Sequence, residues 1–376
     1  MPGEFFLVAT PGMEALIADE AREAGFQGVT VGPGGVTVAG GWPEVWRANL
    51  ELRGPSRVLA RIGAFRAMHL AQLDKRARKF AWGEVLRPDV PVRVEATCHA
   101  SRIYHAGAAA ERVGRAIAET LGAPVQFAGK AEEEFAGGVA LKVRIDDDLC
   151  TFSVDTSGEG LHKRGHKAQV GKAPMRETMA AMFLRACDYR PGEAVVDPMC
   201  GSGTFVIEAA EITGGLQPGR SRAFAFEKLV TFDAAAFCAM RREVSVSGPV
   251  VGFGSDRDDG AIRAATANAE RAGVAGITAF RRAAISDAMP PEGVAPGLVI
   301  VNPPYGARIG DRRQLFALYA AMGRVLRERF AGWRVGIITS DGGLAKATGL
   351  PFLPMGESVA HGGLRIALYR TDVLRP

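Results

Sequence analysis

The four residues Asn302-Pro303-Pro304-Tyr305 combine types that suit the recognition of a planar amine. Two consecutive prolines fix the backbone and remove two N–H donors. The carbonyl of Pro303 and the side-chain oxygen of Asn302 are then both placed to accept the two hydrogens of an NH2 group. Tyr305 offers a flat ring for stacking, as enzymes that act on flipped bases require. The alternative is a proline-rich turn after the apolar run 298–301.

A glycine-rich turn follows another apolar run. Asp197-Pro198-Met199-Cys200-Gly201-Ser202-Gly203-Thr204 comes after residues 194–196, and its glycines let the backbone approach a ligand closely. The turn has neither the GxGxxG spacing of a dinucleotide site nor the GK[ST] of a P-loop. A carboxylate directly before the glycines suits a ligand with cationic and hydroxyl groups, and S-adenosylmethionine has both. The turn alone is equally consistent with an ordinary strand–turn–helix junction.

Three more residues near these strand ends are candidates. Asp256 is the type of acceptor that binds ribose hydroxyls at a strand tip. It could instead cap the helix predicted over 258–272, a role that Asp258 could also take. Asp287 could accept a hydrogen bond from an adenine amine or form a turn. Cys200 has no basic neighbour to activate its thiol, so we interpret it as a packing residue or a backbone donor to the cofactor.

Helices and short apolar strands alternate from about residue 174 onward. Such alternation is typical of a doubly wound parallel sheet, which binds its ligands beyond the carboxyl ends of the strands. Segments 350–354 and 364–369 are expected to form an antiparallel hairpin at the sheet edge. The predicted helices are 174–187, 203–212, 258–272 and 314–330, and the predicted strands are 194–197, 249–253, 277–280, 298–301 and 334–339.

The residues before this sheet are predicted to form a mixed α and β region. The main boundary between the two parts is placed near residue 160. The predicted strands and hairpins are 5–9, 29–38, 92–97 and 139–154, and the predicted helices are 14–24, 42–52 and 104–121.

Two segments are strongly basic. Residues 53–79 carry Asp74 as their only acid, and residues 161–176 carry none. Arg53, Arg57 and Arg61 recur at every fourth position, which predicts that they share one face of a helix. Phosphate binding is predicted for both segments, with a solvated charged face as the alternative. The candidate RNA-binding residues are Arg57, Arg61, Arg66, His162, Lys163, Arg164 and Lys167.

Composition bounds the class of protein. The chain has 376 residues, of which 47% are hydrophobic and 23% charged, with a formal net charge of +5. These values exclude wholesale disorder and permit a polyanionic partner. No apolar stretch has the length of a membrane helix, and the start lacks the features of a signal peptide. The cysteines form no CxxC pair and the histidines no HExxH motif, so we expect a cytoplasmic protein with no metal site.

Together the motifs resemble those of class I S-adenosylmethionine-dependent methyltransferases that modify amino groups. Segment 155–165 (Asp-Thr-Ser-Gly-Glu-Gly-Leu-His-Lys-Arg-Gly) is similar to the junction of the THUMP-containing RNA guanine-N2 methyltransferases. The long insert between helix 203–212 and strand 249–253, which contains Phe-Ala-Phe-Glu-Lys at 224–228, is also similar to that family. The resemblance covers nearly the whole chain. It implies a ferredoxin-like segment over 1–52, a THUMP RNA-binding domain over 53–156, a basic linker over 157–173 and a Rossmann-like methyltransferase domain with a mostly parallel seven-stranded sheet over 174–376.

The resemblance also implies roles for individual residues. Amine binding is expected from Asn302 and stacking from Tyr305, with Pro303 and Pro304 completing the catalytic corner. The expected cofactor contacts are Asp197, Pro198, Cys200, Gly201, Ser202, Gly203, Thr204, Asp256, Arg257, Asp287 and Asn302. The sequence departs from the family at Arg257, where an apolar residue is expected, and at His166, where a tyrosine is expected. Some bacterial relatives carry a second methyltransferase after this one, which a chain ending at Pro376 is expected to lack.

The function implied by this resemblance is S-adenosylmethionine-dependent formation of N2-methylguanosine, in 23S ribosomal RNA. One alternative is the same reaction on transfer RNA. A second is an N6-adenine DNA or protein-glutamine methyltransferase, because Asn-Pro-Pro-Tyr suits any planar amine. A third is an RNA-binding protein without catalytic activity.

Overall fold

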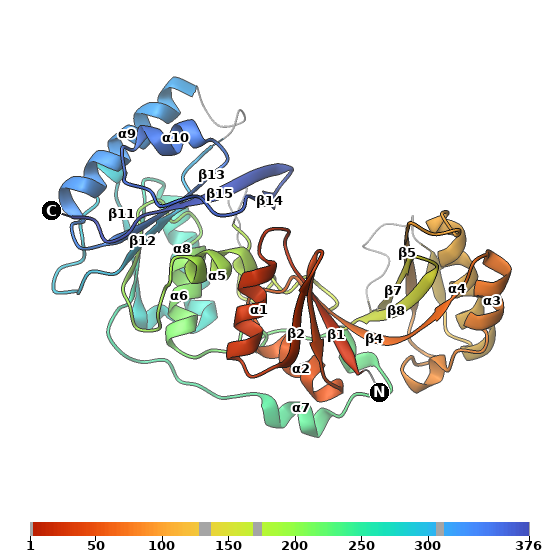
Figure 1. Cartoon of the computed structure of the whole chain (residues 1–376). Helices are drawn as coiled ribbons and strands as arrows, with labels where there is room; N and C mark the ends of the chain where they lie inside the picture. The colour runs from red at the N-terminus through yellow and green to blue at the C-terminus, as the bar shows by residue number, and fades with distance from the viewer. Residues whose placement is uncertain (1–2, 128–136, 168–174, 306–311, 376) are drawn as a thin grey trace. The chain divides into compact units, whose positions relative to one another are not determined.

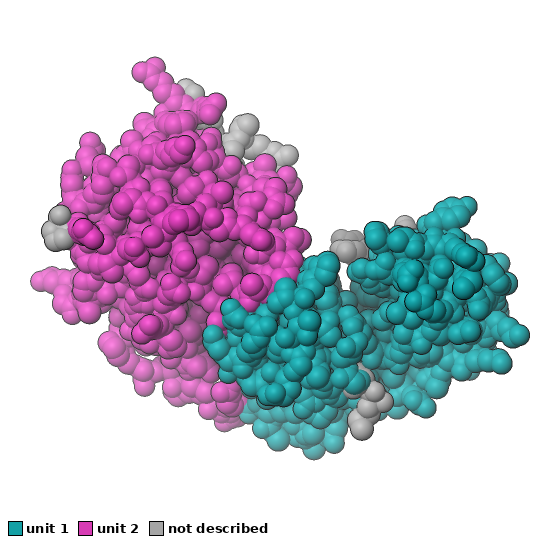
Figure 2. All heavy atoms as spheres, viewed as in Figure 1, with its two compact units in different colours: residues 1–9, 18–161, 222–241 teal, residues 10–17, 162–221, 242–376 magenta. Residues whose placement is uncertain are grey.

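The computed structural model describes residues 3–127, 137–167, 175–305 and 312–375. The chain divides into two compact units (Figure 2). The first unit consists of residues 1–9, 18–161 and 222–241, and the second of residues 10–17, 162–221 and 242–376. The chain therefore passes between the units at several points, one of which lies between residues 161 and 162. Residues 168–173 of the predicted linker 157–173, and the first position of the helix predicted over 174–187, lie outside the described residues.

The first unit is built on an eight-stranded sheet with the order β2-β3-β1-β4-β8-β7-β5-β6. β4 (Arg57–Arg66) pairs with β1 on one side and β8 on the other, so the sheet is continuous across the boundary predicted between residues 52 and 53. The other strands are β1 (Glu4–Val8), β2 (Gln27–Gly32), β3 (Gly35–Ala39), β5 (Val92–His99), β6 (Val125–Phe127), β7 (Val139–Asp146) and β8 (Leu149–Asp155). The helices of this region are α2 (Trp42–Glu51), α3 (Leu70–Ala77), α4 (Ala106–Leu121), α7 (Ala234–Met240) and the part of α1 (Glu14–Glu23) from residue 18 onward.

The prediction that Arg57 and Arg61 lie on a helix is wrong, because both residues lie on strand β4. A spacing of four residues fits a strand as well as a helix, since it is also an even number and returns the side chain to the same face. Val58 and Ala60 alternate with the arginines and are fully buried. Pairing with two neighbouring strands and burial of these apolar side chains decide in favour of the strand.

The second unit contains the predicted seven-stranded, mostly parallel sheet, with the order β11-β10-β9-β12-β13-β15-β14. In Figure 1, α5, α6 and α8 cover one face of this sheet, and α9 and α10 cover the other. The strands are β9 (Val195–Asp197), β10 (Gly252–Asp256), β11 (Thr278–Arg282), β12 (Leu298–Val301), β13 (Arg334–Thr339), β14 (Val359–His361) and β15 (Leu364–Arg370). The helices are α5 (Glu177–Ala186), α6 (Thr204–Thr213), α8 (Asp259–Ala272), α9 (Arg312–Arg329) and α10 (Gly342–Ala347).

Two strands in this unit lie at other residues than predicted. β10 ends at Asp256, three residues later than predicted. The terminal hairpin pairs β14 with β15, whereas segment 350–354 makes only the isolated bridge between Phe352 and Thr371. Prolines within that segment cannot donate to a ladder. Gly362 and Gly363, both at positive φ (55° and 82°), supply the tight two-residue turn that joins β14 to β15.

The insert 222–241 belongs to the first unit, although it interrupts the sequence of the second. Its aromatic residues explain this placement. Phe226 stacks on Phe224 with ring centroids 5.0 Å apart, and it also lies against Trp46 of α2 at 6.2 Å. In the part of the chain that the structure describes, no helix is long and apolar enough to cross a membrane.

Candidate active site

The glycine turn lies at the carboxyl end of β9, as predicted. Gly201 and Gly203 have φ angles of 52° and 84°, in the left-handed region that disfavours residues with a Cβ. A Cβ at Gly203 would come within 3.1 Å of Ala265, and one at Gly201 would meet nothing within 4 Å. Gly203 is therefore needed to pack α6 against α8, while Gly201 leaves an open backbone surface that a ligand could approach.

Asp256 is tied to this turn. Its carboxylate accepts hydrogen bonds from the backbone N–H of Gly201 at 3.1 Å and of Asp258 at 2.9 Å. Asp258 is the N-cap of α8 and accepts from the N–H of Gly260 at 2.7 Å. The two roles left open by the sequence are thus divided between two residues. Asp258 caps the helix, and Asp256 faces the glycine turn.

Two titratable groups in the turn, the Asp197 carboxyl and the Cys200 thiol, have strongly raised pKa values. Asp197 is 2% exposed, and burial raises the pKa of its carboxyl to about 8, with a smaller increase from the charge of Asp256. The Oδ1 atom of Asp197 accepts a hydrogen bond from the N–H of Met199 at 3.1 Å, which opposes this increase. Burial also raises the pKa of the Cys200 thiol far above its usual range, so the thiol remains protonated and unreactive.

Of the two roles predicted for Cys200, the structure favours packing. The residue is buried, and its backbone N–H donates to the carbonyl of Ser255 at 2.9 Å. That donor is already used within the protein, which is contrary to the predicted hydrogen bond to the cofactor.

The Asn302-Pro303-Pro304-Tyr305 corner follows β12, which pairs with β9 in parallel. Val299 is level with Val196, so Asn302 lies about two residues beyond Asp197 on the neighbouring strand. From strand spacing and rise, their Cα atoms are about 8 Å apart. Among the described residues, the buried Oδ1 atom of Asn302 has no hydrogen-bond partner. A buried acceptor without a donor is unusual in a folded protein and fits a ligand's amine.

Tyr305 and Pro304 are also contacted from within the protein. Tyr305 is half-buried against the apolar core beneath α9, and this burial raises the pKa of its hydroxyl. The carbonyl of Pro304 accepts a hydrogen bond from the hydroxyl of Tyr319 at 3.3 Å. Tyr319 was missed by sequence reasoning, because a tyrosine on the apolar face of a helix carries no motif.

Asp287 and Arg257 are less closely connected to the turn. Asp287 ends the short 3-10 helix η5 (Ile285–Asp287), where it is exposed. Unlike Asp256, it is not among the groups that perturb the pKa of Asp197. The carbonyls on either side of it, of Ser286 and Ala288, accept hydrogen bonds from Arg329 at 2.9 and 3.1 Å. Arg257 has an exposed side chain, and its carbonyl accepts from Arg282 at 3.2 Å.

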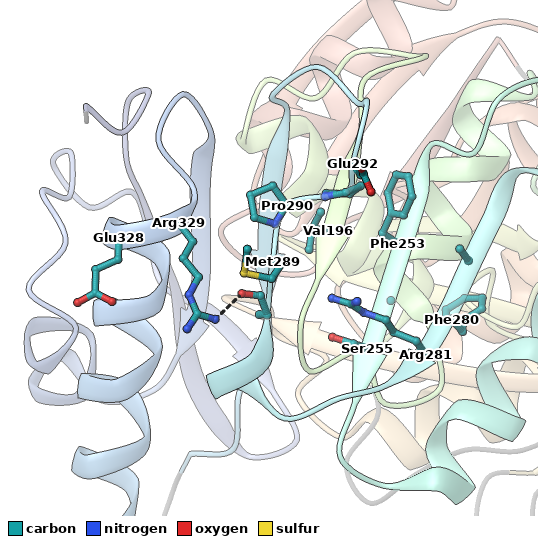
Figure 3. Close-up of a pocket in the computed structure, with 14 residues that line it drawn as sticks. Val196, Phe253, Ser255, Phe280, Arg281, Met289, Pro290, Glu292, Glu328 and Arg329 are labelled. Atoms are coloured by element: carbon teal, nitrogen blue, oxygen red, sulfur yellow. Dashed lines mark hydrogen bonds between the residues drawn. The ribbon is translucent and has the colours of Figure 1, made fainter.

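A cavity of about 860 Å³ lies on the face of the sheet that α9 covers. Figure 3 shows Phe253 and Arg281 from the sheet, Met289 and Pro290 from the loop before β12, and Arg329 from the end of α9 around it. The residues of the glycine turn and of the Asn-Pro-Pro-Tyr corner do not line it. It does reach the chain neighbours of the predicted cofactor contacts, because Val196, Ser255 and Ala288 line it.

Two candidate RNA-binding residues turn inward. Arg164 is 2% exposed and forms an ion pair with Glu208 of α6 at 3.4 Å. Lys167 contacts Glu177 of α5 at 3.1 Å and the hydroxyl of Thr204 at 2.9 Å. Neither cation can reach a phosphate without leaving a buried carboxylate. The local absence of acid over 161–176 was misleading, because the acids that pair with these residues lie at positions 177 and 208.

The other RNA-binding candidates are differently placed. Lys163 is exposed and His162 is partly buried. Arg57 pairs with Asp155 at 2.6 Å, Arg61 pairs with Glu4 at 2.5 Å, and Arg66 pairs with Asp147 at 3.3 Å. The Arg66 side chain is 59% exposed, more than Arg57 or Arg61, so it is the most accessible of the three.

Comparison with known proteins decides the family. Residues 164–355 match the family described as RMKL-like, methyltransferase domain, and residues 4–59 match the RlmL ferredoxin-like domain. The chain belongs to the RMKL-like methyltransferase family. These matches confirm the resemblance to methyltransferases, the predicted Rossmann-like methyltransferase fold and the predicted ferredoxin-like segment at the start of the chain.

Individual relatives agree with this assignment. The chain is 36% identical to a ribosomal RNA large subunit methyltransferase K/L of Syntrophotalea carbinolica, over 99% of this chain and 54% of that protein. It thus spans about half the length of that relative. It is 30% identical to a putative RNA methyltransferase of Synechocystis, over 98% of this chain and 96% of the relative.

A solved structure bears on the cofactor. A putative methyltransferase solved in complex with S-adenosylhomocysteine superposes with a TM-score of 0.83 and 26% identity, covering 99% of this chain and 98% of that one. S-adenosylhomocysteine is what remains of S-adenosylmethionine after methyl transfer. The expected cofactor, S-adenosylmethionine, is therefore confirmed as that of the family.

Proposed function

We propose that this chain transfers a methyl group from S-adenosylmethionine to the N2 amine of a guanine in large-subunit ribosomal RNA. The observation that carries the proposal is the buried Oδ1 atom of Asn302, which has no donor among the described residues and lies beside the glycine turn on the neighbouring strand. An RNA substrate is supported by the names of two relatives, the ribosomal RNA methyltransferase of Syntrophotalea carbinolica and the putative RNA methyltransferase of Synechocystis.

Cofactor binding and amine binding fall to residues at the carboxyl ends of neighbouring strands. Asp197, Asp256 and the open backbone at Gly201 would hold the cofactor, with its ribose at Asp256. The cofactor supplies an electrophilic methyl group on a positively charged sulfur. Oδ1 of Asn302 and the carbonyl of Pro303 would accept the two hydrogens of the guanine amine and so direct the nitrogen lone pair. Both oxygens favour the positive charge that develops on the nitrogen during transfer.

For the RNA, we propose that the region 53–156 acts as a THUMP domain and that Arg66 and Lys163, the two exposed cations among the candidates, contact phosphates. Arg57 and Arg61, whose side chains are less exposed, contribute to a lesser extent. Arg164 and Lys167 are removed from this set, because both pair with buried acids of the methyltransferase unit.

Nucleoside mass spectrometry tests the function directly. The protein is incubated with labelled S-adenosylmethionine and, separately, 23S ribosomal RNA, bulk transfer RNA and double-stranded DNA. We expect labelled N2-methylguanosine from the ribosomal RNA alone. Label in transfer RNA would show that the substrate is transfer RNA and not ribosomal RNA. Label in N6-methyladenine would show that the reaction is adenine methylation and not guanine methylation. RNA binding with no label in any substrate would favour a protein without catalytic activity.

The pKa of Asp197 predicts a proton released on cofactor binding. With a pKa of about 8, this carboxyl is mostly protonated at pH 7, and a bound ammonium group favours the ionised form. Close to one proton should therefore be released per cofactor bound at pH 7, and affinity should rise with pH up to about 8. Calorimetry in two buffers of different ionisation enthalpy measures this number. Asp197→Asn should abolish the release, and an unchanged release in that variant would contradict the assignment.

A further inference from the structure

The Asn-Pro-Pro-Tyr corner has a structural problem that follows from its own sequence. Pro303 and Pro304 have no N–H, so over two consecutive residues the backbone can be held only through its carbonyl oxygens. An acceptor pair that must meet both hydrogens of an amine needs a fixed geometry, because a misplacement of about 1 Å can cost about 100-fold in rate. The corner therefore needs a donor from elsewhere in the fold.

Tyr319 supplies that donor. It lies near the middle of α9, is fully buried, and its hydroxyl donates to the carbonyl of Pro304 at 3.3 Å. Burial raises the pKa of this hydroxyl well above its usual range, so it keeps the proton that it donates. The side chain of Thr339, the fully buried last residue of β13, interacts with this hydroxyl and opposes the increase in its pKa.

Thr339 is fixed in turn. Its hydroxyl oxygen accepts a hydrogen bond from the backbone N–H of Asp341 at 3.2 Å, which directs the hydroxyl proton away from that N–H. The proton of the Thr339 hydroxyl can therefore turn toward the oxygen of Tyr319, while the Tyr319 hydroxyl donates to the carbonyl of Pro304. Thr339 and Tyr319 together connect the end of β13 to the corner after β12.

We infer that Tyr319, oriented by Thr339, is a positioning residue that holds the Asn-Pro-Pro-Tyr corner in the geometry needed to bind the acceptor amine. The inference rests on the proposed function of that corner. It adds a requirement for methyl transfer that lies outside the motif, on α9.

The test is Tyr319→Phe, which removes only the hydroxyl. We expect kcat to fall about 10- to 100-fold, while the Kd and the binding stoichiometry of S-adenosylmethionine remain as in the unchanged protein. Thr339→Ser, which keeps the donor, should be close to normal, whereas Thr339→Val should lower kcat. Because the two residues act as one unit, Tyr319→Phe/Thr339→Val should be no worse than Tyr319→Phe alone.

Tyr189→Phe is the matched control. The Tyr189 hydroxyl likewise contacts one carbonyl, of Ala209 at 3.1 Å, and one threonine, Thr213 at 2.8 Å, but toward the end of α6 away from the glycine turn. Its loss should cost stability without lowering kcat. The inference is overturned if Tyr319→Phe has normal kcat, or if its loss of activity matches its loss of cofactor stoichiometry.

Hydrogen exchange separates this inference from the proposed function. Asn302 and Tyr305 provide the backbone amides of the corner, and the peptide over 298–305 should exchange faster in Tyr319→Phe but not in Tyr189→Phe. If the unchanged protein methylates no guanine, the proposed function fails, and faster exchange would still support Tyr319 as the residue that holds the corner. Unchanged exchange would overturn its positioning role whatever the substrate.

Discussion

Asn302→Ala is expected to lower kcat for methyl transfer by about 100- to 1000-fold, the usual cost of removing one preorganised polar group from a reacting centre. The Oδ1 atom of Asn302 is buried without a partner among the described residues, so its removal breaks no hydrogen bond within that part of the chain. The variant should therefore be folded and bind S-adenosylmethionine with a Kd within about twofold of normal. Single-turnover kinetics and equilibrium dialysis measure the two quantities separately.

Asn302→Asp is the control for this prediction. A carboxylate has the same shape and keeps an acceptor at the position of Oδ1, so this variant should retain more activity than Asn302→Ala. Activity of Asn302→Ala within about threefold of normal would remove Asn302 from the reaction. Equal loss in both variants would mean that the amide NH2, and not the oxygen, is the group that matters.

The parts of this site that the sequence predicted well are those with local causes. Glycines at 201 and 203 adopt positive φ, and two prolines stiffen one corner, whatever lies around them. The alternation of helices and strands then brings both motifs to one edge of a sheet, because parallel strands end on the same side. Asp256 lies at that edge for the same reason, and its hydrogen bond to Gly201 follows from strand order.

The errors arose where a distant segment decides the outcome. Arg57 and Arg61 have a spacing that fits a helix and a strand equally, and pairing with β1 and β8 selects the strand. The aromatic residues of the insert 222–241 join the first unit because Trp46 lies there. Tyr319 is a further case, since only the position of α9 over the sheet brings its hydroxyl to Pro304.

Arg164 gives the largest effect expected on stability. Arg164→Ala would leave the 1% exposed carboxylate of Glu208 without its arginine, and breaking a buried ion pair in this way costs about 3–5 kcal/mol. Denaturant unfolding of the full chain measures this loss. Lys163→Ala, at an exposed neighbouring position, should leave stability unchanged and weaken RNA binding. The slope of log affinity for RNA against log salt concentration should become shallower by about one.

A double variant separates a structural role of Arg164 from RNA binding. Replacing both members of a buried ion pair by apolar residues of similar volume is often neutral, so Arg164→Met/Glu208→Leu should recover most of the stability that Arg164→Ala loses. If the guanidinium serves only to neutralise Glu208, this stable variant binds RNA with normal affinity and normal salt dependence. A stable double variant with weakened RNA binding would instead require that Arg164 leaves its buried position and meets a phosphate when RNA is bound.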